Sequence, residues 1–177
     1  LLKIAPNIKI IASTMAQVGL KKYYGDLPVE VVKTGDSLAL GKRTLQFIEI
    51  PMIHWPDSMM SYIPQDRLLL SNDAFGQHIA TSRRFDDEVD MPAVMFEAAK
   101  YFANLLTHLI PLIKNALDKL EQLHLAIDMI APSHGVIWRS SPGSIIKAYR
   151  DWCSNVCRDK VIIIYDTMWQ ATEHIAK

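Results

Sequence analysis

Three side chains that can bind metal ions, His54, Asp73 and His134, each follow a short apolar run that predicts a β-strand. The runs comprise residues 45–50, 68–70 and 127–130. If these strands end at one edge of a sheet, the three side chains can meet around a cation. Two neutral imidazoles and a carboxylate suit iron or zinc, whereas calcium and magnesium prefer oxygen. A single His or Asp at a strand end is more often a capping or solvated residue, so the prediction depends on the residues around each.

The residues around these three positions are distinctive. They read His-Trp-Pro-Asp-Ser-Met over 54–59, Ser-Asn-Asp-Ala-Phe-Gly over 71–76 and Ala-Pro-Ser-His-Gly over 131–135. In order and in flanking residues they resemble the metallo-β-lactamase superfamily and, within it, the flavodiiron proteins. Hydrolytic members tend to follow the first of these His residues with Thr-Pro-Gly or a similar turn. The resemblance extends over most of 1–152 and implies an α/β fold, the C-terminal portion of a metallo-β-lactamase-like αββα sandwich.

The resemblance also implies roles for the three side chains. His54 would bind one iron, His134 would bind a second, and Asp73 would bridge the two. The family carries a further motif upstream, His-x-Glu-x-Asp-His, which supplies four more ligands and is absent from the 177 residues. Three ligands would hold metal only weakly, so we expect full occupancy to need the missing part of the domain.

A second signal lies near the C-terminus, where the β-branched run 160–165 predicts a strand buried on both faces. The loop 166–172 follows it, and 173–177 opens a helix. Such a turn offers backbone N–H groups and threonine hydroxyls to a phosphate, although it could equally be an ordinary connection. The segment resembles the start of a flavodoxin, which binds FMN here, but it lacks glycine and has Gln170 where that family often has Gly or Asn. The resemblance assigns flavin contacts to Thr167, Met168, Trp169, Gln170, Ala171 and Thr172.

These resemblances divide the chain into three parts. Residues 1–152 are expected to form the metallo-β-lactamase-like di-iron domain without its N-terminal part, 153–159 a linker, and 160–177 the first strand, loop and helix of a doubly wound flavodoxin-like domain. The chain starts without methionine and stops about one turn into a helix, so we expect it to be part of a longer protein.

The elements of the first domain follow from local patterns. Strands are expected over 7–12, 29–32, 37–40, 43–50, 59–63 and 67–70. Helices are expected over 14–24, 92–123 and 142–152. Pro111 should kink or break the long helical zone, because proline lacks the backbone N–H that an interior position needs. Its apolar stripe, which includes Tyr101, is predicted to be a core face.

Composition disfavours several classes of protein, among them nucleic-acid-binding, membrane-spanning and secreted proteins. Lysine plus arginine and aspartate plus glutamate both number 19, which disfavours a nucleic-acid partner. No apolar stretch is long enough to span a bilayer, and the N-terminus does not resemble a signal peptide. Cys153 and Cys157 could form a disulfide, a metal clip or two reduced thiols; we expect reduced thiols and a cytoplasmic location.

The expected function is an oxidoreductase that reduces dioxygen to water or nitric oxide to nitrous oxide at a di-iron centre, with electrons relayed by FMN. The resemblance implies a head-to-tail homodimer or tetramer and a donor such as rubredoxin, a deazaflavin or a nicotinamide-linked reductase. The alternatives are a binuclear zinc hydrolase and an inactive fragment that only binds a partner. His78 is expected to lie near the site without binding metal, and the charged run 83–90 to be solvated or to dock a partner.

Overall fold

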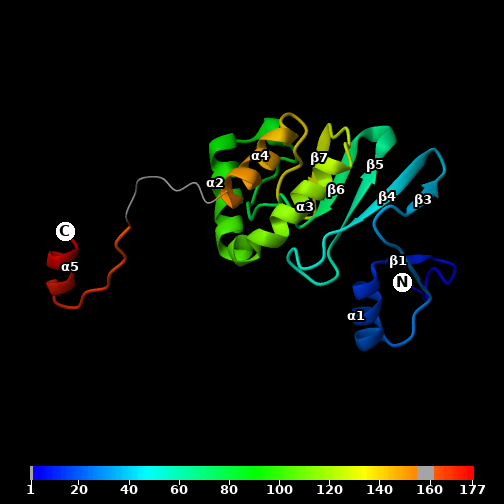
Figure 1. Cartoon of the computed structure of the whole chain (residues 1–177), viewed down its shortest axis with the longest axis horizontal. Coiled ribbons are helices and arrows are strands. Elements are labelled where there is room, and N and C mark those ends of the chain that lie inside the picture. Colours follow the sequence, from blue (N-terminus) through cyan, green and yellow to red (C-terminus); the bar gives the residue numbers. More distant parts are fainter. Residues whose placement is uncertain (1, 155–161) are drawn as a thin grey trace.

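The computed structural model describes residues 2–154 and 162–177. Its larger sheet has the strand order β3-β4-β5-β6-β7 (Figure 1). The strands are β3 (Ser37–Leu40), β4 (Arg43–Glu49), β5 (Met59–Ile63), β6 (Leu68–Asn72) and β7 (Met129–Pro132). Neighbours from β3 to β6 pair antiparallel, whereas β6 and β7 pair parallel. Strands β4, β6 and β7 therefore run in the same direction, and their carboxyl ends lie at one edge.

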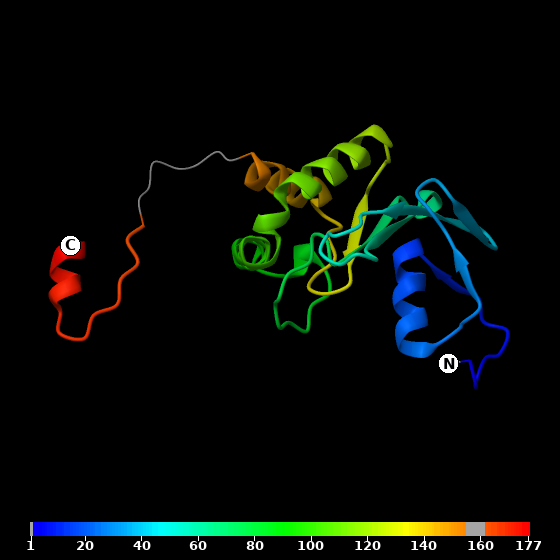
Figure 2. The same cartoon turned by 60° about the horizontal axis from the view of Figure 1, so that its bottom comes forward.

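A smaller unit precedes this sheet. Strands β1 (Ile10–Ala12) and β2 (Val29–Val31) pair parallel, and helix α1 (Thr14–Tyr24) connects them. Ser13 caps this helix, because its side chain accepts a hydrogen bond from the backbone N–H of Ala16 at 3.2 Å. The helix has no buried residue. Figure 2 shows α1 beside this small sheet, away from the other helices of the domain.

Three longer helices lie together beside β6 and β7 (Figure 1). They are α2 (Met91–Tyr101), α3 (Ile110–Gln122) and α4 (Pro142–Cys153). The predicted helical zone is confirmed, and its interruption is a π-helical turn over Phe102–Leu106 followed by a 3₁₀ turn over Thr107–Leu109. Pro111 is the second residue of α3, where its missing N–H costs no hydrogen bond. The break therefore precedes the proline.

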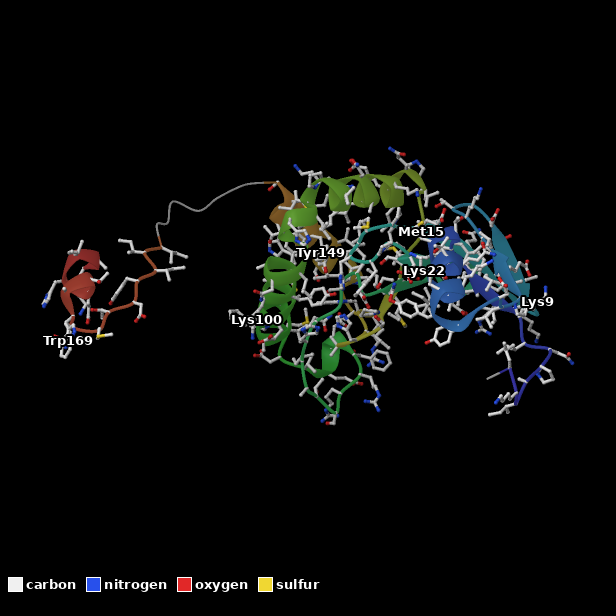
Figure 3. All side chains as sticks on the ribbon, turned by 90° about the horizontal axis from the view of Figure 1, so that it is seen from below. Lys9, Met15, Lys22, Lys100, Tyr149 and Trp169 are labelled. Atoms are coloured by element: carbon white, nitrogen blue, oxygen red, sulfur yellow. The ribbon has the colours of Figure 1, made fainter. Side chains whose placement is uncertain are left out.

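The core forms where these helices cover the sheet. From the helices, Val94, Ala98 and Phe102 are buried, and from the sheet Leu69 and Ile130 are buried with them. The predicted core stripe of the long helical zone is thus confirmed. Figure 3 shows Tyr149 within the helical part of the molecule. Its ring centroid lies 4.8 Å from that of Phe75, in the loop after β6, so α4 packs against the edge of the sheet that carries the candidate site.

The C-terminal segment differs from the prediction. Residues 162–165 form no strand, and Ile162, Ile163 and Ile164 are largely exposed. The physical reason is that a single strand has no partner for its backbone hydrogen bonds. Helix α5 (Ala171–Ala176) begins two residues before the predicted start. The start of the predicted strand, most of the predicted linker and Cys157 lie outside the described residues, whereas Cys153 is buried on α4.

Across the described ranges, none of the helices combines the length and apolar character that a membrane crossing requires.

Candidate metal centre

The structure brings the three predicted metal ligands together. His54 lies in the connection between β4 and β5, Asp73 directly follows β6, and His134 lies two residues after β7. His54 Nε2 is 3.4 Å from Asp73 Oδ2, and His134 Nε2 is 3.9 Å from Asp73 Oδ1. About a quarter of each side chain remains exposed, so the cluster is accessible from solvent. The common direction of β4, β6 and β7 produces this convergence.

The loop that carries His54 is held by one hydrogen bond within it and by one from the residue that caps α1. Ser58 is buried, and its hydroxyl accepts from the backbone N–H of Trp55 at 3.2 Å. Ser13, which caps α1, donates through its hydroxyl to the carbonyl of Asp57 at 3.1 Å. Ser58 therefore closes the turn that follows His54.

Asp73 is oriented by the loop that carries His134. The Ser133 hydroxyl donates to Asp73 Oδ1 at 2.5 Å, and the Ser133 backbone N–H donates to the Asn72 carbonyl at 2.8 Å. On the other side, Tyr149 Oη accepts from the backbone N–H of Phe75 at 3.0 Å. As a result, Oδ2 of Asp73 faces one imidazole and Oδ1 faces the other.

This geometry fits metal ligation. Two ligand atoms that each lie about 2.1 Å from one ion at a tetrahedral angle are about 3.4 Å apart. The distance between His54 Nε2 and Asp73 Oδ2 is 3.4 Å, and the second pair, at 3.9 Å, is somewhat wider. Among the described residues, no group of three or more His, Cys, Asp or Glu side chains could hold a metal ion together. Each pair instead faces its own position, which suits a carboxylate shared between two ions and leaves both positions in need of further ligands.

Aromatic rings enclose the cluster on the side of α2. The ring centroid of Tyr101 lies 5.1 Å from that of His134 and 6.5 Å from that of His54. Burial, and secondly the negative charge of Asp73, raises the pKa of Tyr101 to about 12. The phenol therefore keeps its proton at neutral pH. The sequence analysis assigned Tyr101 to the core face alone. Its hydroxyl could have indicated more, because a buried tyrosine usually has a polar group near its hydroxyl.

Two further aromatic side chains lie beside the cluster. The His78 ring lies 5.1 Å from the His134 ring and 4.9 Å from the Tyr101 ring, edge to face with the latter. Trp55 is 61 % exposed and its ring lies 6.0 Å from that of His54. The expectation that His78 lies near the site is confirmed, and Trp55 forms an exposed wall beside His54.

The predicted flavin loop lies in the C-terminal segment. Met168 and Trp169 are both 85 % exposed, and Gln170 precedes α5 in a left-handed conformation. The Asp166 side chain accepts from the backbone N–H of Thr167 at 2.8 Å. The assignment of flavin contacts to this loop stays a prediction.

Comparison with known proteins identifies the family. A family model described as ODP family beta lactamase matches residues 1–135. A nitric oxide reductase of Moorella thermoacetica is 51 % identical over 99 % of this chain and 45 % of its own length. A coenzyme F420H(2) oxidase of Methanothermobacter marburgensis is 43 % identical over 97 % of this chain and 43 % of its own length. The chain thus spans less than half the length of these relatives.

Solved structures agree with these relatives. The rubredoxin oxygen:oxidoreductase of Desulfovibrio gigas superimposes with a TM-score of 0.93 at 36 % identity, over 98 % of this chain and 44 % of its own. The flavodiiron protein of Giardia intestinalis superimposes with a TM-score of 0.90 at 37 % identity, over 99 % of this chain and 44 % of its own. The family model covers most of the chain, and the chain therefore belongs to the ODP family of β-lactamases, with the metallo-β-lactamase-like fold of the flavodiiron proteins.

Proposed function

We propose that this chain contributes to the non-haem di-iron centre of a flavodiiron oxidoreductase that reduces nitric oxide to nitrous oxide, dioxygen to water, or both. The position of Asp73 is the observation that carries the proposal, because its two oxygens face His54 and His134 separately. A nitric oxide reductase and a coenzyme F420H(2) oxidase among the relatives support the reaction class.

In this proposal His54, Asp73 and His134 would hold the iron ions, with Asp73 shared between the two imidazoles, and further ligands would be needed to complete the centre. When bound, a pair of iron ions supplies redox chemistry and open positions for a diatomic substrate. The chain's own residues orient these ligands: Ser133 holds Asp73 through a hydrogen bond. Tyr101 holds a proton on its hydroxyl beside the site, and its buried ring limits access of water from the side of α2.

The remaining parts of the proposal rest on the family. FMN would relay electrons to the irons, and residues 167–172 would contact its phosphate within a complete flavodoxin-like domain. The electron donor would be rubredoxin, a deazaflavin or a nicotinamide-linked reductase, and a cytoplasmic head-to-tail homodimer or tetramer would bring the flavin of one subunit to the irons of another. The rubredoxin oxygen:oxidoreductase and the coenzyme F420H(2) oxidase among the similar proteins support the first two of these donors.

Metal analysis of single variants tests the metal site. His54→Ala, Asp73→Asn and His134→Ala should each lower the iron bound per chain at least about tenfold, because each removes one of few ligands. His108→Ala is the matched control, since His108 is exposed on the 3₁₀ turn before α3. Equal iron content in all four variants would refute the assignment of the ligands.

The identity of the metal and the reaction separate this proposal from its alternatives. Bound iron and consumption of nitric oxide or dioxygen by a longer form of the protein that carries the remaining ligands support the reductase. A colourless zinc protein that hydrolyses an ester or phosphodiester would instead establish the binuclear hydrolase. Absence of both activities in the longer form would leave a binding subunit.

A further inference from the structure

Gln77 is a buried polar side chain next to the candidate metal centre. It lies four residues after Asp73 and is 1 % exposed. Burial of an amide without hydrogen-bond partners is unfavourable, so a buried glutamine is expected to have partners at both ends. Gln77 Nε2 donates to the Phe75 carbonyl at 2.8 Å, and Oε1 accepts from the backbone N–H of Val136 at 2.8 Å. The side chain thus links the loop after β6 to the loop after β7.

The main chain of Gln77 contacts the same loop a second time. Its carbonyl oxygen lies 3.2 Å from His134 Nδ1. A carbonyl oxygen can only accept a hydrogen bond, so this contact requires the proton of the neutral imidazole to be on Nδ1. The lone pair of His134 is then on Nε2, the nitrogen that faces Asp73. One residue therefore fixes both the backbone after His134 and the tautomer of its ring.

The two loops can approach this closely because one of them carries a glycine. A Cβ atom on Gly135 would lie 2.2 Å from Gln77 Oε1 and 2.8 Å from the Gln77 carbonyl oxygen. Gly135 also has a φ of +84°, which favours glycine. Trp138 Nε1 donates to the Phe75 carbonyl at 2.9 Å, the same oxygen that accepts from Gln77 Nε2. The partner of the amide nitrogen is therefore itself held by a second hydrogen bond.

We infer that Gln77 is a positioning residue of the metal centre, whose buried amide holds the two loops in register so that His134 presents an unprotonated Nε2 beside Asp73. The inference deepens the proposed function and rests on it, because metal is what the ring would be positioned for. The hydrogen bonds that carry it join protein atoms alone, so the state of His134 can be measured in the metal-free protein.

The test replaces Gln77 with methionine, which has a similar length and volume but neither the amide donor nor its acceptor. In two-bond ¹H–¹⁵N spectra of the metal-free protein, the parent should show His134 as a single tautomer with the proton on Nδ1. Gln77→Met should give a mixture of tautomers, and its affinity for Co²⁺, used as a spectroscopic probe, should fall about 10–100-fold. Gln122→Met, at an exposed position in the last turn of α3, is the matched control and should match the parent.

The outcomes distinguish positioning from packing. If Gln77→Met folds, as judged by circular dichroism, and keeps both the parent tautomer and the parent Co²⁺ affinity, the inference is overturned. If it does not fold, Gln77→Glu keeps the acceptor for Val136, removes the donor to Phe75 and is judged by the same two measurements. A parent protein with its His134 proton on Nε2 also overturns the inference, whatever metal it binds. A parent with the expected tautomer that binds no Co²⁺ supports the role of Gln77 in ring orientation and counts against the proposed function alone.

Discussion

Replacing Gly76 with alanine is a direct test of how closely the backbone approaches the candidate ligand His134. A Cβ atom at position 76 would lie 2.4 Å from His134 Cε1, 2.8 Å from Nδ1 and 3.0 Å from Nε2. Non-bonded carbon atoms pack at about 3.5–4.0 Å, so the ring would have to move by about 1 Å. Metal sites tolerate deviations in ligand distance of about 0.2 Å. A displacement of about 1 Å therefore removes His134 from bonding reach.

The size of the effect follows from this displacement. Overpacking of this kind costs about 1–3 kcal/mol in the free energy of unfolding. Loss of ligand orientation should weaken metal binding by at least about 10–100-fold. Titration with Co²⁺, followed by its visible absorption, measures the affinity, and urea unfolding of the metal-free protein measures the stability.

Gly143→Ala provides the control for the same chemical change. Gly143 lies in the first turn of α4, and a Cβ atom there has no heavy atom within 4 Å. Alanine at this position should stabilise the protein by about 0.5–1 kcal/mol and leave metal binding unchanged. If Gly76→Ala binds Co²⁺ as tightly as Gly143→Ala does, then the ring is not confined by the backbone and the reasoning about the site is wrong.

Three further predictions concern other contacts. Asp86→Ala should lower the free energy of unfolding by about 3 kcal/mol in urea titrations, because the buried carboxylate accepts from the backbone N–H groups of residues 139–141. As the control, Asp118→Ala breaks an exposed ion pair and should cost less than about 1 kcal/mol. Ser133→Ala should weaken Co²⁺ binding about tenfold through the lost hydrogen bond to Asp73, with a stability change of less than about 1 kcal/mol. Burial raises the pKa of the Cys153 thiol, so iodoacetamide should alkylate it slowly at pH 8 and faster as the pH rises toward that pKa. Alkylation should be fastest in urea, where the thiol is exposed. Mass spectrometry of the peptide that contains Cys153 measures the rate.

The sequence was sufficient to predict the strands, whereas the meeting of three side chains at one edge was expected from the resemblance. Each of His54, Asp73 and His134 follows an apolar run, and local hydrophobic patterns report strands of this kind reliably. The parallel pairing of β6 and β7 could not be derived from either run alone, because pairing depends on how the helices between them fold back. The structure supplies that information.

Two parts of the site lay outside sequence reasoning for a physical reason. Tyr101 has the spacing of a core residue, and only the packing of α2 against the loops shows that its ring lies 5.1 Å from that of His134. Gln77 gives no signal in the sequence, because its role depends on a partner 59 residues away, the backbone of Val136. The strand expected at 160–165 is not formed over its described part, 162–165, although the sequence signal for it is clear. Its local propensity is strong, but the described part has no neighbouring strand with which to pair.

The parallel pairing of β6 with β7 has a consequence for the order of events during synthesis. Asp73 and His134 are separated by the whole helical crossover, so their loops can meet only after the ribosome has released β7 and the intervening helices have closed over the sheet. A cation held between these two loops would thus require that β6, β7 and the helices between them have already folded. Metal binding between these loops would therefore follow the folding of this region and would not nucleate it.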